Sequence, residues 1–187
     1  RHPAFVARAD DGTWSRLHPL LERGLQPRLE GHAHPLVADV VGRAVTWHRD
    51  AGHLREPIEL LLAAHRWTEA VALLVESSLR FAEDARHQEF LALWGEIPTP
   101  AWERDPVAVL TIALIQPGAG HAESAFDLLF RPPLTDFDLP DGTRAIADVA
   151  QALLAPWSPD PGASLAAAER AIDTLDRVDQ ADLPPVC

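Results

Sequence analysis

The chain of 187 residues is 47% hydrophobic and 24% charged, a balance typical of a folded domain with a buried core. Its net charge of −12 argues against direct contact with nucleic acid, because that contact requires clustered positive charge to neutralise phosphates. With one cysteine, Cys187, and no apolar run near the roughly 20 residues of a membrane-spanning helix, we expect a cytoplasmic protein without disulfides or membrane contact.

The N-terminal part carries the sequence pattern of a β-hairpin followed by a helix. Residues 5–9 and 13–17 are short alternating runs on either side of an Asp-Asp-Gly turn, which is favoured in hairpins. The period then becomes helical as far as Leu29. Two strands alone are barely stable in water, so we expect residues 1–31 to be the end of a domain whose remainder precedes this sequence.

From residue 32 onward, the apolar residues predict consecutive pairs of helices joined by short turns. The pairs start near residues 36, 67, 106 and 143, which are spacings of roughly 31 to 39 residues. This is the range of tetratricopeptide-like and other helical-hairpin repeats. We therefore predict that residues 32–187 form a right-handed array of antiparallel helical hairpins, so that the chain is all-α apart from a short N-terminal β-hairpin stub.

The residues expected to face the core follow the i, i+3, i+4, i+7 spacing of an amphipathic helix. The segment 107–115 is apolar nearly all round, which predicts a helix packed on several sides. The predicted core stripes are Val37, Val40, Val41, Ala44, Val45; Trp67, Ala70, Val71, Leu74, Val75, Leu79; Phe90, Leu91, Trp94, Ile97; Ala122, Ala125, Phe126, Leu129, Phe130; Ile146, Val149, Ala150, Leu153, Leu154; and Leu165, Ala168, Ile172, Leu175.

Capping residues predict where several of these helices begin and end. Gly52 is a suitable stop for the helix that precedes it. Thr99 and Asp105 each stand directly before a proline, a pattern that favours a capping side chain followed by Pro at the first helical position. After the irregular stretch 131–142, we expect Asp141 or Thr143 to cap the next helix.

The sequence contains no complete catalytic or metal-binding pattern. The sequence has no Lys, which excludes the P-loop route to nucleotide hydrolysis. His32 and His34 lack an acidic or thiol partner at ligand spacing, and we expect the nine histidines to be structural or solvent-exposed. Counted from Asp136, an apparent calcium loop fails at three of its required positions. We predict no catalytic residue, no cofactor, no metal ligand and no enzymatic activity.

Two stretches resemble the MalT/LuxR-type STAND transcription regulators. In the first, a Trp-x-Arg-Leu-His-x-Leu run after the hairpin is similar to the end of the winged-helix subdomain in that family. The second is similar to the first helical pairs that follow it. The residues that carry the resemblance are Trp14, Arg16, His18, Leu20, Arg28 and Leu29, and then Arg43, Ala44, Trp47, His48, Gly52, Glu56, Ile58, Glu59, Ala63, Ala64, Trp67, Ala70, Leu73, Leu74, Leu91, Trp94, Ile97 and Pro98.

This sequence departs from the family at Pro57, where Ala is usual, and at His65-Arg66, where Gly-Asp is common. The resemblance covers roughly residues 5–130 and implies a modular regulator. Such a protein has a nucleotide-binding module, a winged helix, a helical sensor array and usually a C-terminal LuxR-type helix-turn-helix. Residues 1–31 would then end the winged helix, and residues 32–187 would begin the tetratricopeptide-like region.

The expected function is that of a non-catalytic linker and sensor segment of a bacterial transcription regulator. It would contact other domains of the same regulator, partner proteins or a small effector, without touching DNA itself. The sequence has no initiating Met and no leader, and it starts in mid-pattern, so we expect a piece of a longer protein. No residue of an effector or partner site is predicted.

Three alternatives remain open. The first is a free-standing tetratricopeptide-like scaffold or adaptor. The second is a helical ligand-binding or enzyme domain, which a closed pocket with convergent polar groups would favour. The third places the same helical module behind a protein kinase domain, since MalT-like arrays also occur there.

Overall fold

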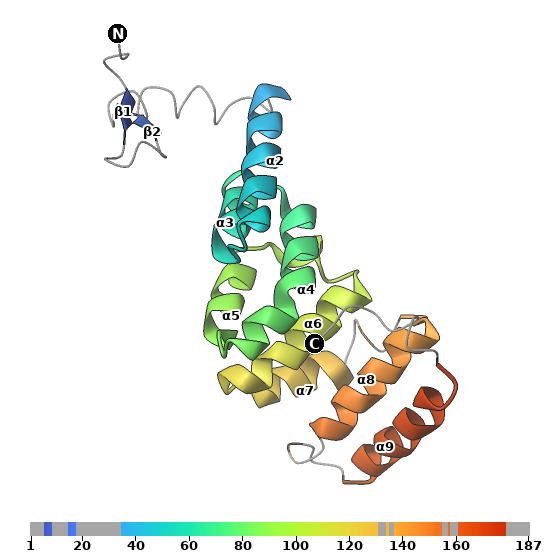
Figure 1. The fold of residues 1–187 in the computed structure, drawn as a ribbon. Coiled ribbons are helices and arrows are strands. Elements are labelled where there is room, and N and C mark those ends of the chain that lie inside the picture. The colour runs from blue at the N-terminus through green and yellow to red at the C-terminus, as the bar shows by residue number, and fades with distance from the viewer. Residues whose placement is uncertain are drawn as a thin grey trace.

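In a computed structural model, the part of the chain that the structure describes folds almost entirely into helices (Figure 1). The structure describes residues 6–8, 15–17, 35–130, 134, 137–154, 157 and 161–178. Within this part the helices are α2 (Pro35–Asp50), α3 (Arg55–Ala63), α4 (Trp67–Glu83), α5 (His87–Gly95), η1 (Thr99–Ala101), α6 (Pro106–Ile115), η2 (Gln116–Ala119), α7 (Ala122–Phe130), α8 (Asp141–Leu153) and α9 (Pro161–Leu175).

The predicted all-α class is confirmed, and the helices begin close to the predicted positions. The first helices of the four pairs start at residues 35, 67, 106 and 141. Two short strands, β1 (Val6–Arg8) and β2 (Ser15–Leu17), pair antiparallel. The turn between them and the helix predicted up to Leu29 lie outside the described residues, so the hairpin stub and its winged-helix role stay predictions.

Left-handed residues end several of the helices and set the direction of the chain after them. Gly52, His65 and Ala85 have φ values of 78°, 55° and 56°. At each of these turns, the next backbone N–H donates to a carbonyl five residues back, as from His53 to His48 and from Arg86 to Phe81. This is the Schellman arrangement of a helix end, and it confirms the stop predicted at Gly52.

Of the side-chain caps that the sequence predicts, one is present and the others are not. Asp105 caps α6 as predicted, because its carboxylate accepts hydrogen bonds from the backbone N–H groups of residues 107 and 108. Thr99 was expected to do the same, but it lies inside η1 and makes no capping bond. The cap predicted from Asp141 or Thr143 is also wrong, because α8 starts directly after Pro140 without a side-chain cap.

Helices adjacent in sequence pack against each other, as α2 with α3 and α8 with α9. Contacts of α3 with α4, of α4 with α6 and of α6 with α8 join each pair to the next. Figure 1 shows the result as a succession of helical pairs from α2 at one end to α9 at the other. No helix in the described ranges has the length and apolar character required to cross a membrane.

Two buried clusters meet at α6. One includes residues of α3, α4 and α5, such as Ile58, Leu74 and Phe90. The other includes residues of α7 and α8, such as Leu129. Ile112 belongs to the first cluster and Leu110 to the second, so α6 is packed on more than one side, as its all-round apolar sequence predicts.

Several residues of the predicted core stripes are exposed instead. A helical period identifies an apolar face, but it does not show which neighbour covers that face. In α9, small residues such as Ala167 and Ala171 are buried, while the predicted stripe is largely exposed. The exposed members of the predicted stripes are Val40, Leu79, Leu153, Leu165, Ile172 and Leu175.

Candidate functional site

The described residues form a polar groove between α2 and α4, beside the turn that joins α2 to α3. We call it the α2–α4 groove, and its volume is about 400 Å³. Its floor is apolar, since Leu54 and Leu73 are buried there. The residues that line the groove are Thr46, Arg49, Asp50, His53, Leu54, Leu73, Glu76, Ser77 and Arg80.

The lengths of the helices explain why a groove forms here. The helix α3 has only 9 residues, whereas α2 has 16 and α4 has 17. The helix α3 contacts both of the longer helices. An ion pair between Arg49 of α2 and Glu76 of α4, with Nη2 and Oε1 2.5 Å apart, bridges the two helices that line the groove.

The groove also holds charges that this ion pair leaves unmatched. Arg80 donates a long hydrogen bond of 3.4 Å to the carbonyl of Gly52, and among the described residues no carboxylate forms an ion pair with it. Asp50 likewise has no ion-pair partner in that part of the chain. A guanidinium and a carboxylate at one groove suit a ligand that carries both an acceptor and a donor, as a peptide segment or an amino-acid-like molecule does.

A second, more open depression adjoins the groove along α2. Its volume is about 470 Å³, and it shares Thr46 and Asp50 with the groove. Trp47 lines it and is 47% exposed. Partly exposed tryptophans are common anchors of protein interfaces, so the C-terminal half of α2 offers recognition elements on both of these surfaces.

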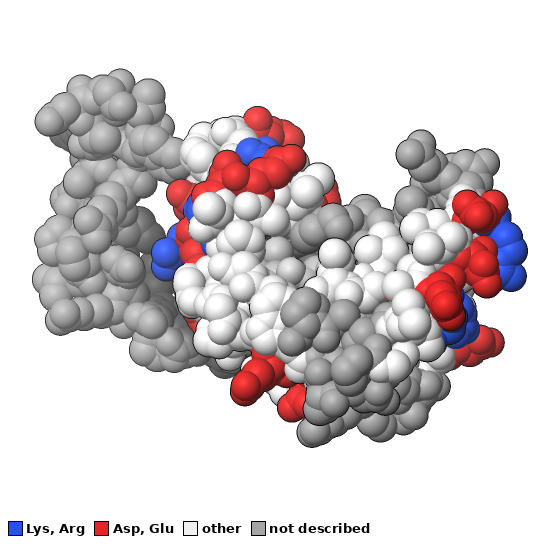
Figure 2. Space-filling model, turned by 90° about the horizontal axis from the view of Figure 1, so that it is seen from below, with Lys and Arg blue, Asp and Glu red and all other residues white. Residues whose placement is uncertain are grey.

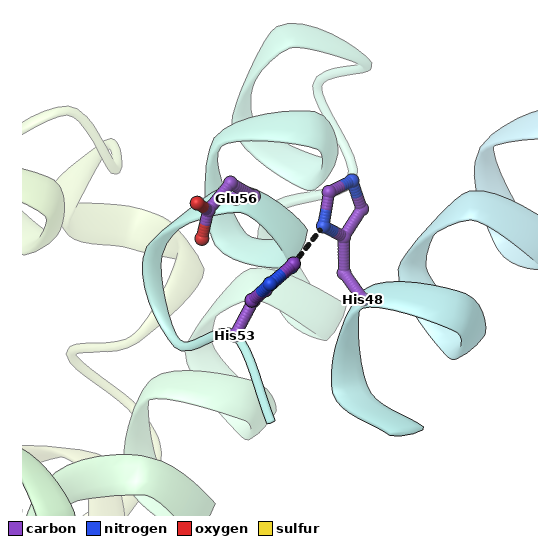
Figure 3. A group of neighbouring side chains, drawn as sticks. All are labelled: His48, His53 and Glu56. Atoms are coloured by element: carbon purple, nitrogen blue, oxygen red, sulfur yellow. Dashed lines mark hydrogen bonds between the residues drawn. The ribbon is translucent and has the colours of Figure 1, made fainter. Parts of the chain in front are cut away.

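Three potential metal ligands gather at the α2–α3 turn: His48, His53 and Glu56 (Figure 3). The Nδ1 atoms of the two imidazoles are 2.9 Å apart and share a hydrogen bond. One ligand atom from each of the three residues lies within 4.8 Å of the others. The ring of Trp47 packs edge-on against both histidines, with centroid distances of 4.9 Å and 5.8 Å.

The sequence did not single out this cluster, because its spacing matches no standard metal motif. The available signal was the pattern His-x-x-x-Gly-His, in which the glycine ends a helix and so brings the flanking side chains together. The histidines and aspartates that the sequence offers as possible metal ligands are not part of this cluster. His32, His34 and Asp136 lie outside the described residues, and Asp138 pairs with Arg144 at 3.6 Å.

Basic side chains do not form a continuous patch on the face shown in Figure 2, where they lie beside acidic ones.

Two of the described ion pairs have the same spacing, an arginine and a glutamate three residues later, at the start of a helix. Arg66, directly before α4, pairs with Glu69 in the first turn of that helix, and Arg86, directly before α5, pairs with Glu89 in the same way. The hydrogen bond from Arg86 lowers the pKa of Glu89, with burial opposing it and the charge of Arg86 adding to it.

The described residues thus form a largely helical fold with one polar groove between α2 and α4. The chain is similar to the serine/threonine-protein kinase PknK of Mycobacterium tuberculosis and of Mycobacterium bovis, with 28% identity over 151 residues. The match covers 77% of this chain but only 14% of each relative. No protein-family model and no solved structure matches the chain.

Proposed function

We propose that the chain is a non-catalytic helical array of a larger cytoplasmic regulator of the MalT/LuxR type. Residues 32–187 would form a right-handed, tetratricopeptide-like solenoid, and residues 1–31 the end of a winged-helix subdomain. The observation that carries the proposal is the succession of four helical pairs, whose starts are 32 to 39 residues apart. Stacked hairpins of this kind bury a continuous core and leave a long surface for partners.

A position where the sequence departs from the regulator family gives further support. The family commonly has Gly-Asp where this chain has His65-Arg66. His65 adopts a φ of 55° at the end of α3, a left-handed conformation that glycine adopts without steric cost. The backbone therefore keeps the shape that a glycine would favour, although the residue itself has changed.

The similarity to PknK favours a second candidate, in which the same array belongs to a protein that also has a kinase domain. The relatives are named as serine/threonine-protein kinases, and the chain spans about a seventh of their length. In this candidate the array again acts by contact with other domains. Both candidates assign it the same task, which is to relay the binding of a partner or effector.

Phosphoryl transfer by this segment itself does not fit its composition. Protein kinases use a lysine to hold the phosphates of ATP, and this chain contains no lysine. A role in recognition fits better. In the α2–α4 groove, Arg80 and Asp50 provide opposite charges above an apolar floor, which is the combination that binds a polar protein segment or a small zwitterionic effector.

The first test is the gene on either side of this sequence. We expect it to encode a nucleotide-binding module or a kinase domain in the same polypeptide. That neighbouring module, expressed separately, should bind the chain in isothermal titration calorimetry. A gene with neither module would overturn the proposal, and a kinase domain without a nucleotide-binding module would select the second candidate.

Variants of the groove test whether binding uses the surface described above. The double substitution Arg80→Ala with Asp50→Ala should weaken binding by about tenfold or more, because a charged hydrogen bond contributes roughly 1.5–3 kcal/mol. Arg104→Ala is the matched control, since Arg104 is also an exposed arginine but lies between η1 and α6. If the double variant and Arg104→Ala bind the neighbouring module with equal affinity, the groove is excluded as the binding surface.

A further inference from the structure

The helix end at Gly52 determines which side chains meet at the α2–α3 turn. The N–H of Gly52 donates to the carbonyl of Arg49, and that of His53 donates to the carbonyl of His48, both at 2.9 Å. In this type of helix end, the side chain that follows the left-handed residue usually makes an apolar contact with the side chain four positions before that residue. Here the two positions carry imidazoles, so the backbone places two nitrogen ligands side by side.

The two imidazoles are close to the separation that a tetrahedral metal ion requires. Their Nδ1 atoms are 2.9 Å apart, with one ring donating a proton and the other accepting it. Two nitrogens bound to one Zn²⁺ at its usual bond length are about 3.3 Å apart. A metal ion between them therefore requires an opening of a few tenths of an ångström, with the donor ring moving its proton to Nε2.

Glu56, in the first turn of α3, is the third potential ligand. Among the residues that the structure describes, its carboxylate has no ion pair or hydrogen bond. The neighbouring carboxylates are engaged, because Glu59 pairs with Arg55 and Glu89 pairs with Arg86. Glu56 is exposed, so its side chain is able to turn toward the imidazoles.

We propose that His48, His53 and Glu56 bind one divalent transition-metal ion of the Zn²⁺ class, with water in the remaining position. Two imidazoles and a carboxylate suit Zn²⁺ and its first-row neighbours better than Mg²⁺ or Ca²⁺, which prefer oxygen ligands alone. The metal would tie the C-terminal end of α2 to the first turn of α3 and would fix the edge of the α2–α4 groove, which His53 lines.

Calorimetric titration of the purified, tag-free chain with Zn²⁺ tests this site. We expect one equivalent to bind with micromolar affinity, and Mg²⁺ to give no saturable binding. His48→Gln and His53→Gln should each weaken the binding at least tenfold, because even indirect partners of a metal ligand contribute roughly ten- to hundredfold. Glu56→Gln should weaken it less, and His121→Gln, at another exposed histidine, should leave it unchanged.

Zn²⁺ binding that is absent, or that is unaffected by both histidine substitutions, would overturn the proposal. The helix end itself uses the backbone of residues 48 and 53, so we expect the glutamine variants to fold. A second measurement needs no variant. Zn²⁺ should protect His48 and His53 of the wild-type chain from diethyl pyrocarbonate, since the metal then occupies one ring nitrogen and a proton the other. Equal modification of these histidines and of His121, with and without Zn²⁺, would also contradict the site.

Discussion

At the scale of single residues, the chain accepts an unfavourable backbone conformation where its helices end. His65 and Ala85 have φ values of 55° and 56°, although residues with a side chain are disfavoured there by roughly 1–2 kcal/mol. Gly52 and Gly120 adopt the same conformation without that cost. The sequence predicts the stop at Gly52, but it gives no comparable signal at Ala85, because nothing in an alanine marks a left-handed residue.

Replacing Ala85 with glycine should therefore stabilise the protein. The side chain is exposed, so its loss removes little packing. Relief of the left-handed strain should exceed the extra entropy of glycine in the unfolded chain, for a net gain of about 0.5–1 kcal/mol. Urea unfolding followed by circular dichroism measures this change.

The matched control for Ala85→Gly is the reverse substitution at Gly52. A side chain added at Gly52 meets no atom within 4 Å, so Gly52→Ala tests the backbone conformation alone. It should destabilise the protein by about 1 kcal/mol. A loss of stability in Ala85→Gly would show that the left-handed conformation is not what limits stability at this turn.

The stability that the ion pair between Arg86 and Glu89 contributes should depend on pH. Because the pKa of Glu89 is lowered in the folded state, chiefly by the hydrogen bond from Arg86, the pair stabilises the fold fully above the unfolded pKa of about 4.3. This stabilisation is lost as the pH falls through the lower folded pKa. Glu89→Gln should cost about 0.5–1 kcal/mol at pH 7.

Acid titration of stability checks this prediction. The difference between Glu89→Gln and the wild-type chain should shrink as the pH falls below the unfolded pKa of glutamate, about 4.3. Glu83→Gln, at an exposed position of α4, should change little at any pH. A difference for Glu89→Gln that stays constant down to low pH would assign its effect to packing and not to charge.

At the scale of secondary-structure elements, the sequence predicts the positions of the helices better than their capping residues. The apolar period depends on local spacing, and it places α4 and α6 near their observed bounds. Caps depend on the exact loop geometry before the helix. Asp105 and Thr99 have the same sequence signal. Asp105 has an extended backbone, with φ of −103° and ψ of 107°, and makes the capping bonds, whereas Thr99 lies inside η1.

The two capping candidates give a direct comparison. Asp105→Ala removes two hydrogen bonds to the first turn of α6 and should destabilise the protein by about 1 kcal/mol. Thr99→Ala removes no capping bond and should stay within about 0.5 kcal/mol of the wild-type chain. Chemical denaturation of both variants measures the difference, and equal costs would contradict the assignment of the cap.

Of the two candidate sites, the histidine cluster depends on local sequence, whereas the groove depends on how distant helices pack. The helix end at Gly52 is predictable from the sequence, and the contact between His48 and His53 follows from it once the type of helix end is known. The α2–α4 groove is not predictable in this way. Its lining residues come from two helices separated by α3, so it depends on how a whole hairpin stacks on the next helix.

At the scale of the whole molecule, α9 shows how periodicity and packing diverge. It packs on α8, with the small side chains of Ala167 and Ala171 buried. Its larger apolar residues, Leu165 and Ile172, are 63% and 62% exposed. The sequence marks the stripe of large residues as the core face, because a hydrophobic period does not distinguish a covered face from an open one.

The two faces of α9 should therefore respond differently to substitution. Leu165→Gln combined with Ile172→Gln should leave the free energy of unfolding within about 1 kcal/mol of the wild-type value, because these exposed side chains contribute little packing. Ala171→Leu should destabilise by about 1–3 kcal/mol, because its added bulk must fit between α8 and α9. The double variant should also bind less of the hydrophobic dye ANS. If instead the double variant unfolds and Ala171→Leu is tolerated, then α9 packs through the stripe that the sequence indicates, and the order of faces described for this helical pair is wrong.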